Sequence, residues 1–196
     1  KLIKDKFYKK SNFIRLLSLQ MIFNGPTKTG HIAPGLSIAE IITYLFDYLI
    51  LKNNKKSNYF ILSKGHAAPI LYSKYFSMGL ITKKDFNKFR TFNAKLQGHP
   101  DKRSLKLLDS GSGALGQGLS ISIGYALSEK IRGGSKNTFC LLGDGELQEG
   151  QIWEAAMFAG ARKLNNLCAI IDGNKFQNEY SVKDTLNIAN MKNKWQ

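Results

Sequence analysis

Two short apolar runs in the sequence are each followed by polar residues of the kind that bind metal ions. The run TFCLL leads into GDG (143–145), and the run NLCAII leads into DGN (172–174). Carboxylate and amide oxygens are ligands that Mg²⁺ and Ca²⁺ accept. In a parallel sheet, ligands bind at the carboxyl ends of the strands. The pattern predicts that Asp144, Asn174 and a nearby backbone carbonyl hold a hard cation that carries a diphosphate.

The elements that would position these residues follow from hydrophobic periodicity. Helical spacing of apolar residues predicts helices over 7–23, 37–51, 66–78 and 115–131, and short apolar runs bounded by turn formers predict buried strands over 58–63, 137–144 and 166–173. A further helix over about 147–163 would join the last two strands. Long helices between strands imply parallel pairing. The sequence therefore predicts an α/β fold with a central parallel sheet flanked by helices, in one domain over 1–196 whose last residues, 184–196, contain no obvious core element.

The Gly-Asp-Gly segment alone has a simpler explanation. After a strand it is often only a tight turn in which the Asp caps the next helix, and taken alone this reading is favoured. A helix that starts behind Asp144 would also offer free N–H groups and a positive dipole end to a phosphate. The spacing changes the judgement, because 28 residues (146–173) separate this segment from Asn174.

That spacing resembles the signature of thiamine diphosphate enzymes, and the surrounding sequence is similar to transketolase in particular. The similar segments are TGHIAPGLSIAEIITYLF, LSKGHAAPILYS, GHPD, GSGALGQGLSISIGYAL and GDGELQEGQIWEAAMFAG, in transketolase order and over nearly the whole chain. The resemblance implies a thiamine-diphosphate-binding fold that binds thiamine diphosphate with Mg²⁺ or Ca²⁺. It also implies transfer of a two-carbon ketol group from a ketose phosphate to an aldose phosphate.

The resemblance further implies roles for individual residues. The metal ligands would be Asp144, Asn174 and the backbone carbonyl of Phe176. The cofactor would contact His66, Gly113, Leu115, Asp144, Gly145 and Asn174. Glu149 would support the cofactor site from an interface between subunits, although near a helix start a carboxylate can also be a mere dipole partner.

The segment GSGALG (111–116) also matches the glycine pattern of a dinucleotide-binding loop. That pattern needs a preceding strand and an acidic residue about 20 positions later. The sequence shows neither. The segment is therefore better explained as a helix start with close backbone packing.

All three histidines, His31, His66 and His99, directly follow a glycine inside the similar segments. A lone histidine is more often structural than catalytic, but imidazole titrates near neutrality and can donate or accept a proton. By the resemblance, His66 would lie near the diphosphate, His99 near the C1 hydroxyl of the donor sugar, and His31 near donor and acceptor hydroxyls. These three are the candidate catalytic residues.

Charge and cysteine content limit the other partners. The chain has 29 Lys and Arg against 14 Asp and Glu, a net charge of +15. The basic residues are mostly scattered lysines without arginine-aromatic interleaving, which favours a solvated surface over a nucleic-acid groove. No apolar run reaches membrane-spanning length. From these two observations we expect a protein that binds neither nucleic acid nor membrane. The two cysteines lack metal-site spacing and the sequence suggests no disulfide framework, so we expect a cytoplasmic location.

One part of the expected active site has no counterpart in this sequence. Thiamine enzymes need a second glutamate at the aminopyrimidine, which transketolases carry in a pyrimidine-binding domain C-terminal to this region. We expect a C-terminal transketolase subunit or domain as partner, in a dimer of such pairs. A split subunit is preferred over a truncated chain, because Lys1 lies close to the family's first helix. Alternatives are a deoxyxylulose-phosphate synthase, a noncatalytic or regulatory relative, or a basic polyanion-binding module.

Overall fold

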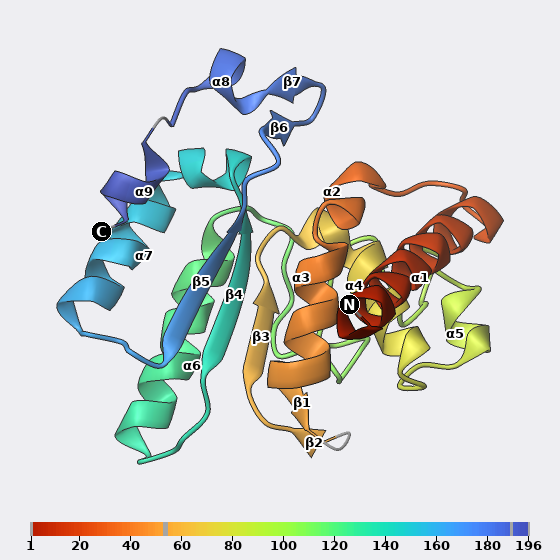
Figure 1. The fold of residues 1–196 in the computed structure, drawn as a ribbon, viewed down its shortest axis with the longest axis horizontal. Helices are drawn as coiled ribbons and strands as arrows, with labels where there is room; N and C mark the ends of the chain where they lie inside the picture. Colours follow the sequence, from red (N-terminus) through yellow and green to blue (C-terminus); the bar gives the residue numbers. More distant parts are fainter. Residues whose placement is uncertain (1, 53–54, 189, 196) are drawn as a thin grey trace. The chain divides into compact units, whose positions relative to one another are not determined.

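Three short strands pair in parallel in the order β3-β4-β5 (Figure 1). They are β3 (Tyr59–Leu62), β4 (Thr138–Gly143) and β5 (Leu167–Asp172). Each is one residue shorter at both ends than the sequence predicts. The register places Gly143 opposite Asp172, so the carboxyl ends of β4 and β5 lie together. The predicted parallel sheet is confirmed.

The structure, a computed structural model, describes residues 2–52, 55–188 and 190–195. The chain divides into two compact units. Unit 1 consists of Lys1–Asn58 and Gly65–Gly113, and unit 2 consists of Tyr59–Lys64 and Ala114–Gln196, which includes the whole parallel sheet. Within the described ranges, no helix is both long and apolar enough to cross a lipid bilayer.

In unit 2, α6 (Gln117–Ile131) and α7 (Gly150–Ala161) pack with the sheet around one core (Figure 1). Its buried members are Ile61, Leu119, Ile123, Ala126, Cys140, Leu142, Leu147, Ile152, Ala155 and Leu164. Burying a large apolar side chain contributes about 1.5–3 kcal/mol. The middle strand β4 is almost fully buried, but Cys168 in β5 is exposed. The prediction that β5 is buried is wrong, because within the described residues this strand has a neighbour on one side only.

The chain after β5 forms a small hairpin and two helical turns. These elements are β6 (Phe176–Gln177), β7 (Tyr180–Ser181), α8 (Val182–Thr185) and α9 (Met191–Lys194). Met191 and Trp195 pack against the core of unit 2, and the ring centroids of Trp195 and Trp153 are 5.9 Å apart. The segment 184–196, in which the sequence shows no obvious core element, therefore does contribute side chains to the core. Residues four apart share one face of a helix, so a single turn suffices to bury two of them.

The described residues of unit 1 form helices, irregular segments and one antiparallel pair of two-residue strands. The long α1 (Leu2–Asn24) packs against α3 (Ala39–Tyr44) and α4 (Ala68–Ser77). The shorter elements are α2 (Ala33–Leu36), the π-helix η1 (Leu45–Ile50), β1 (Leu51–Lys52), β2 (Lys55–Lys56), the 3-10 turn η2 (Gly65–Ala67) and α5 (Lys83–Phe86). The predicted helix over 37–51 is thus divided into α3 and η1.

Ion pairs reinforce the helix packing of unit 1. The guanidinium of Arg15 on α1 donates two hydrogen bonds to the Glu40 carboxylate on α3. Asp47 accepts from Lys10 on α1 and from Lys74 on α4. Burial alone would raise the pKa of Asp47, but hydrogen bonds from the two ammonium groups outweigh burial and lower that pKa below its usual value. Charged pairs therefore join α1 to α3 and to η1, and α4 to η1, in addition to apolar packing.

Candidate active site

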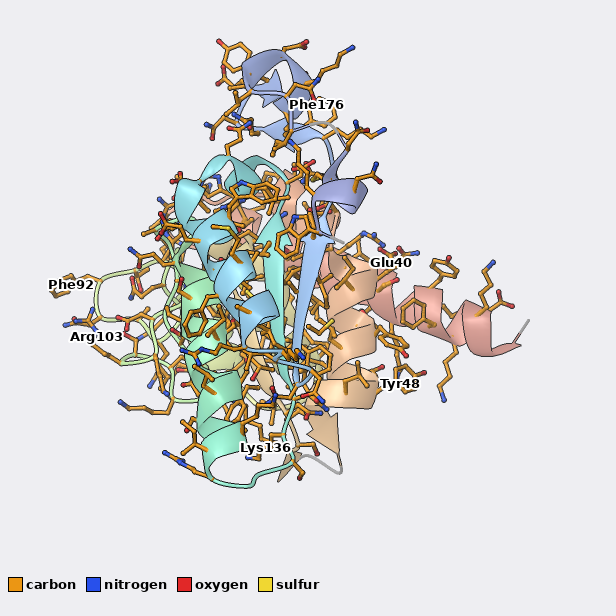
Figure 2. All side chains as sticks on the ribbon, turned by 90° about the vertical axis from the view of Figure 1, so that its left-hand side faces the viewer. Glu40, Tyr48, Phe92, Arg103, Lys136 and Phe176 are labelled. Carbon is orange, nitrogen blue, oxygen red and sulfur yellow. The ribbon has the colours of Figure 1, made fainter. Side chains whose placement is uncertain are left out.

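Asp144 follows β4 and Asn174 follows β5, and both accept hydrogen bonds from the backbone of residues 175–176. Asp144 is 3% exposed, and its Oδ1 accepts from the N–H of Gly145 at 2.9 Å while Oδ2 accepts from the N–H of Lys175 at 2.6 Å. Asn174 Oδ1 accepts from the N–H of Phe176 at 2.8 Å. The structure therefore brings the two predicted ligands to one end of the sheet, the end at which Phe176 is labelled in Figure 2.

The residues after Asp144 do not form the helix start that the sequence predicts. A 3-10 turn, η3 (Gly145–Gln148), follows directly, Glu149 is extended with ψ 124°, and α7 begins only at Gly150. The predicted bounds 147–163 are therefore wrong. Asp144 caps η3, as the simpler turn explanation expects. The start of α7, where a helix dipole acts, therefore lies six residues after Asp144 in the chain rather than directly behind it.

A buried carboxylate that the sequence analysis missed braces this end of the sheet. Glu146 is 2% exposed and accepts hydrogen bonds from the Ser63 hydroxyl, from the N–H of Gly116 at 2.8 Å and from the N–H of Gly143 at 3.1 Å. These donors lie after β3, before α6 and at the end of β4. Glu146 therefore ties three elements of unit 2 together.

A buried ion pair, also missed, lies at the same end. Lys64 Nζ is 2.5 Å from Asp172 Oδ2, and the two side chains are 1% and 8% exposed. Asp172 Oδ2 also accepts from Asn174 Nδ2 at 3.0 Å, and the Asp172 carbonyl accepts from the N–H of Asp144 at 3.2 Å. A signal was present in the sequence: Lys64 directly follows one predicted strand and Asp172 falls at the end of another, the position that identified Asp144.

The loop before α6 places Leu115 and Gly116 against α7. The Leu115 carbonyl accepts from Gln151 Nε2 at 3.0 Å. Gly116 caps α6 at φ 85°, and an added Cβ would lie 2.7 Å from Gln151 Nε2, so only glycine is accommodated there. Gly145 is also tightly packed, since a Cβ would lie 2.9 Å from Cβ of Gln177. The packed helix start expected for this segment is confirmed.

The three candidate catalytic histidines gather in unit 1. The ring centroids of His31 and His66 are 5.6 Å apart, and those of His31 and His99 are 6.3 Å apart. His31 and His99 are exposed and His66 is half-buried. Loss of hydration at its protein-facing side, and then the charges of His31 and Arg90, lower the pKa of His99 below 6.5. The cluster therefore contains a ring that is neutral and able to accept a proton at pH 7.

The glycines before two of these histidines are explained by packing. A Cβ at Gly65 would lie 2.7 Å from Ser112 Oγ and 2.9 Å from the backbone nitrogen of Gly113. A Cβ at Gly98 would lie 3.2 Å from Arg90 Nε. Gly113 itself leaves room for the next ring, since a Cβ there would be 3.4 Å from Cγ of His99. Close approach of the chain at Gly65 thus holds His66 and Gly113 in one neighbourhood of unit 1.

The remaining predicted residues are accessible. The Glu149 side chain is exposed and makes no capping hydrogen bond at the start of α7. Phe176 is 68% exposed, and its predicted ligand is the backbone carbonyl. In the described part of the chain, no group of three or more His, Cys, Asp or Glu side chains could hold a metal ion. A cation at Asp144 would therefore need amide and carbonyl ligands as well.

The sequence matches a known family. The family described as "Transketolase, thiamine diphosphate binding domain" matches residues 8–196. Transketolase-like protein 2 from Bos taurus is 40% identical over 153 residues, which cover 75% of this chain and 24% of that protein. A protein from Actinobacillus succinogenes that is named as one subunit of apulose-4-phosphate transketolase is 35% identical over 198 residues, covering 98% of this chain and 71% of that protein.

Solved structures show the same fold. Transketolase from Campylobacter jejuni matches with a TM-score of 0.87 at 30% identity, over 96% of this chain and 31% of that chain. Transketolase from Pichia stipitis in complex with sedoheptulose 7-phosphate matches with a TM-score of 0.88 at 28% identity, over 96% of this chain and 30% of that chain. The predicted thiamine-diphosphate-binding fold is confirmed, and the chain spans less than a third of these structures.

Replacing Glu146 with alanine should destabilise the protein, because three donors would lose their buried acceptor. Each buried unsatisfied donor costs about 1–3 kcal/mol, so we expect the free energy of unfolding to fall by roughly 3 kcal/mol or more. This free energy is measured by urea unfolding, with circular dichroism as the signal. Glu154→Ala, at an exposed position of α7, is the control, with a change below about 0.5 kcal/mol. Equal stability of the two variants would contradict the bracing role.

Proposed function

The chain belongs to the transketolase family as a thiamine diphosphate binding domain, and from this premise we propose that it forms the cofactor-binding part of a ketol transferase. The reaction moves a two-carbon unit from a ketose phosphate to an aldose phosphate. The observation that carries the proposal is the position of Asp144 and Asn174 at the carboxyl end of the sheet, where both accept hydrogen bonds from the backbone of residues 175–176. When bound, thiamine diphosphate supplies the carbon nucleophile that the transfer needs.

The carboxyl end of the sheet holds an excess of buried negative charge. Lys64, Asp144, Glu146 and Asp172 are 1%, 3%, 2% and 6% exposed, and one positive against three negative formal charges leaves two negative. Buried charges are normally paired or bound to metals. A divalent cation would offset the excess and would separate a diphosphate from the carboxylates. The charge count therefore supports Mg²⁺ or Ca²⁺ at this position.

The donor atoms suit such a cation. Asp144 offers a carboxylate, Asn174 an amide oxygen and Phe176 a backbone carbonyl, and oxygen is the ligand atom that Mg²⁺ and Ca²⁺ prefer. A carboxylate has about four lone-pair positions, of which Asp144 uses one on each oxygen for backbone N–H groups. The Asp144 carboxylate can therefore keep its hydrogen bonds and coordinate an ion. Gly145 and Leu115 are assigned to the cofactor pocket, with Glu149 as support from an interface between subunits.

The histidines of unit 1 are assigned to the sugar substrates and, for His66, to the diphosphate. His99 and His31 would bind sugar hydroxyls and transfer protons. The lowered pKa of His99 supports its use as a proton acceptor near pH 7. Gly113 packs against the His99 ring, since a Cβ there would lie 3.4 Å from His99 Cγ, and His99 is exposed to solvent elsewhere.

Activity in this proposal requires a second domain. The chain spans 24% of transketolase-like protein 2 but 71% of a protein whose name describes it as one subunit of a transketolase. We propose that the aminopyrimidine is bound by a C-terminal transketolase subunit or domain, in a dimer of such pairs. The split-subunit arrangement is favoured by the high coverage of the apulose-4-phosphate transketolase subunit.

A cytoplasmic location is part of the same proposal. Cys140 and Cys168 are both free thiols. Burial raises the pKa of Cys140 to about 12, so this thiol stays protonated and unreactive in the core. Free cysteines are typical of proteins in a reducing compartment.

Asp144→Asn should abolish tight cofactor binding, because the amide cannot replace the charge that faces the cation. Changes in residues that merely support a metal ligand cost about 10–100-fold in affinity, so losing a ligand should cost at least about 100-fold. Calorimetry with thiamine diphosphate and Mg²⁺ on the full-length protein with its partner measures this. Asp184→Asn, at an exposed position of α8, is the control. Unchanged affinity in the Asp144 variant, or after EDTA, would refute the metal site.

His99→Ala should lower turnover with a donor ketose far more than it lowers cofactor affinity. A general acid or base contributes about 10²–10⁴-fold in rate. Steady-state kinetics of the complete enzyme, together with cofactor titration, separate the two effects. Lys95→Ala, which removes an exposed ion pair with Asp85, should leave both constants near those of the wild type. Equal loss of turnover in both variants would rule out a specific role for His99.

Residues 1–196 alone should bind thiamine diphosphate poorly and transfer no ketol group, because half of the cofactor pocket belongs to the pyrimidine-binding part. Circular dichroism first establishes that the isolated chain is folded. Adding the pyrimidine-binding subunit or domain should restore binding and transfer. Transfer by the isolated chain would contradict the proposed division of the site.

A further inference from the structure

The ion pair between Lys64 and Asp172 joins two outer strands of the sheet across the middle one. Lys64 follows β3 and Asp172 ends β5, while β4 lies between them. An added Cβ at Gly143, the last residue of β4, would lie 3.9 Å from both Cβ and Cδ of Lys64. The stem of Lys64 therefore runs over the end of β4, and its ammonium group reaches Asp172 at 2.5 Å.

Asp172, together with the N–H of Phe176, fixes the orientation of the Asn174 amide. An ionised carboxylate only accepts hydrogen bonds, so Asn174 must present its NH₂ group to Asp172 Oδ2, at 3.0 Å. The amide is planar, and its oxygen therefore points away from Asp172. It accepts from the N–H of Phe176, at 2.8 Å. Asn174 Oδ1 is the atom assigned above to the cation.

Lys64 in turn determines where the Asp172 carboxylate lies. A buried carboxylate without its partner is strongly unfavourable, and it turns toward whatever positive charge is near. Without Lys64, the formal charge of the four buried groups at this end would change from two negative to three negative. Asp172 would then compete with Asn174 for the cation and would repel a diphosphate.

We propose that Lys64 is a positioning residue for the cation site, acting through Asp172 to fix the orientation of the Asn174 amide. This inference rests on the proposed function. It assigns a role to Lys64 that involves no contact with cofactor or substrate. Partners of metal ligands typically change metal affinity by about 10–100-fold, and that range is expected for Lys64.

The test measures Mn²⁺ affinity in the presence of thiamine diphosphate, by the electron paramagnetic resonance signal of free Mn²⁺, on the full-length protein with its partner. Lys64→Met should weaken Mn²⁺ binding by about 10–100-fold. The double variant K64M/D172N removes both charges with little change of shape and so avoids an unpaired buried carboxylate. It should recover thermal stability but still bind Mn²⁺ at least about 10-fold more weakly, because an asparagine at 172 can present either end to Asn174.

A matched control exists in unit 1, where Lys74 pairs with Asp47 and the side chains are 4% and 12% exposed. The variants K74M and K74M/D47N should change stability but leave Mn²⁺ affinity unchanged. Wild-type affinity in folded K64M/D172N would overturn the inference, as would equal weakening in the Lys74 variants. The variant Asp144→Asn separates the failure of this inference from the failure of the proposed function. If both Asp144→Asn and the Lys64 variants bind Mn²⁺ with wild-type affinity, the proposed cation site is wrong. If Asp144→Asn weakens Mn²⁺ binding but the Lys64 variants do not, only the inference about Lys64 fails.

Discussion

Burial of charge at the carboxyl end of three parallel strands is the constraint on which the rest of unit 2 depends. Four ionisable side chains lie there almost without solvent. Charged groups in such a place must each find partners, and the contacts show how they do. Glu146 uses hydroxyl and backbone donors, Asp144 uses backbone donors, and Asp172 uses Lys64 and Asn174. These contacts are also the ones that fix β3, β4, α6 and the segment after β5 relative to one another.

The same constraint explains which parts of the site could be predicted from the sequence. Strand ends are visible as apolar runs that stop, so Asp144 and Asn174 were expected at one edge of a parallel sheet, and they lie there. Burial of a charge is decided by a partner that is distant in the chain. Lys64 and Asp172 are 108 positions apart, and Glu146 meets Ser63 at a separation of 83. No local pattern encodes either pairing, although a charged residue beside the end of an apolar strand was a usable sign for Lys64 and Asp172.

Errors at element boundaries have a similar origin. The run from 147 reads as one helix because its apolar spacing is helical, but the Glu146 carboxylate accepts from the N–H of Gly143 and Gly116, which holds the chain in a 3-10 turn before α7 begins. Tertiary hydrogen bonds thus override local propensity where the chain turns at the strand end. The π-helix after α3 falls inside the helix predicted over 37–51, but periodicity does not separate it from α3. The single turn of α9 is shorter than the window in which a period can be recognised.

Asp144 differs in burial from His31 and His99, and the roles proposed for these residues account for the difference. Asp144, the proposed cation ligand, is buried and held by two backbone donors, as a fixed ligand would need to be. His31 and His99 are exposed, and their proposed role of exchanging protons with a sugar requires that access. The glycine before His66 belongs to neither group. It is required because the chain passes 2.9 Å from where its Cβ would be, so packing explains the glycine of this short motif, while the role proposed for His66 rests on its chemistry.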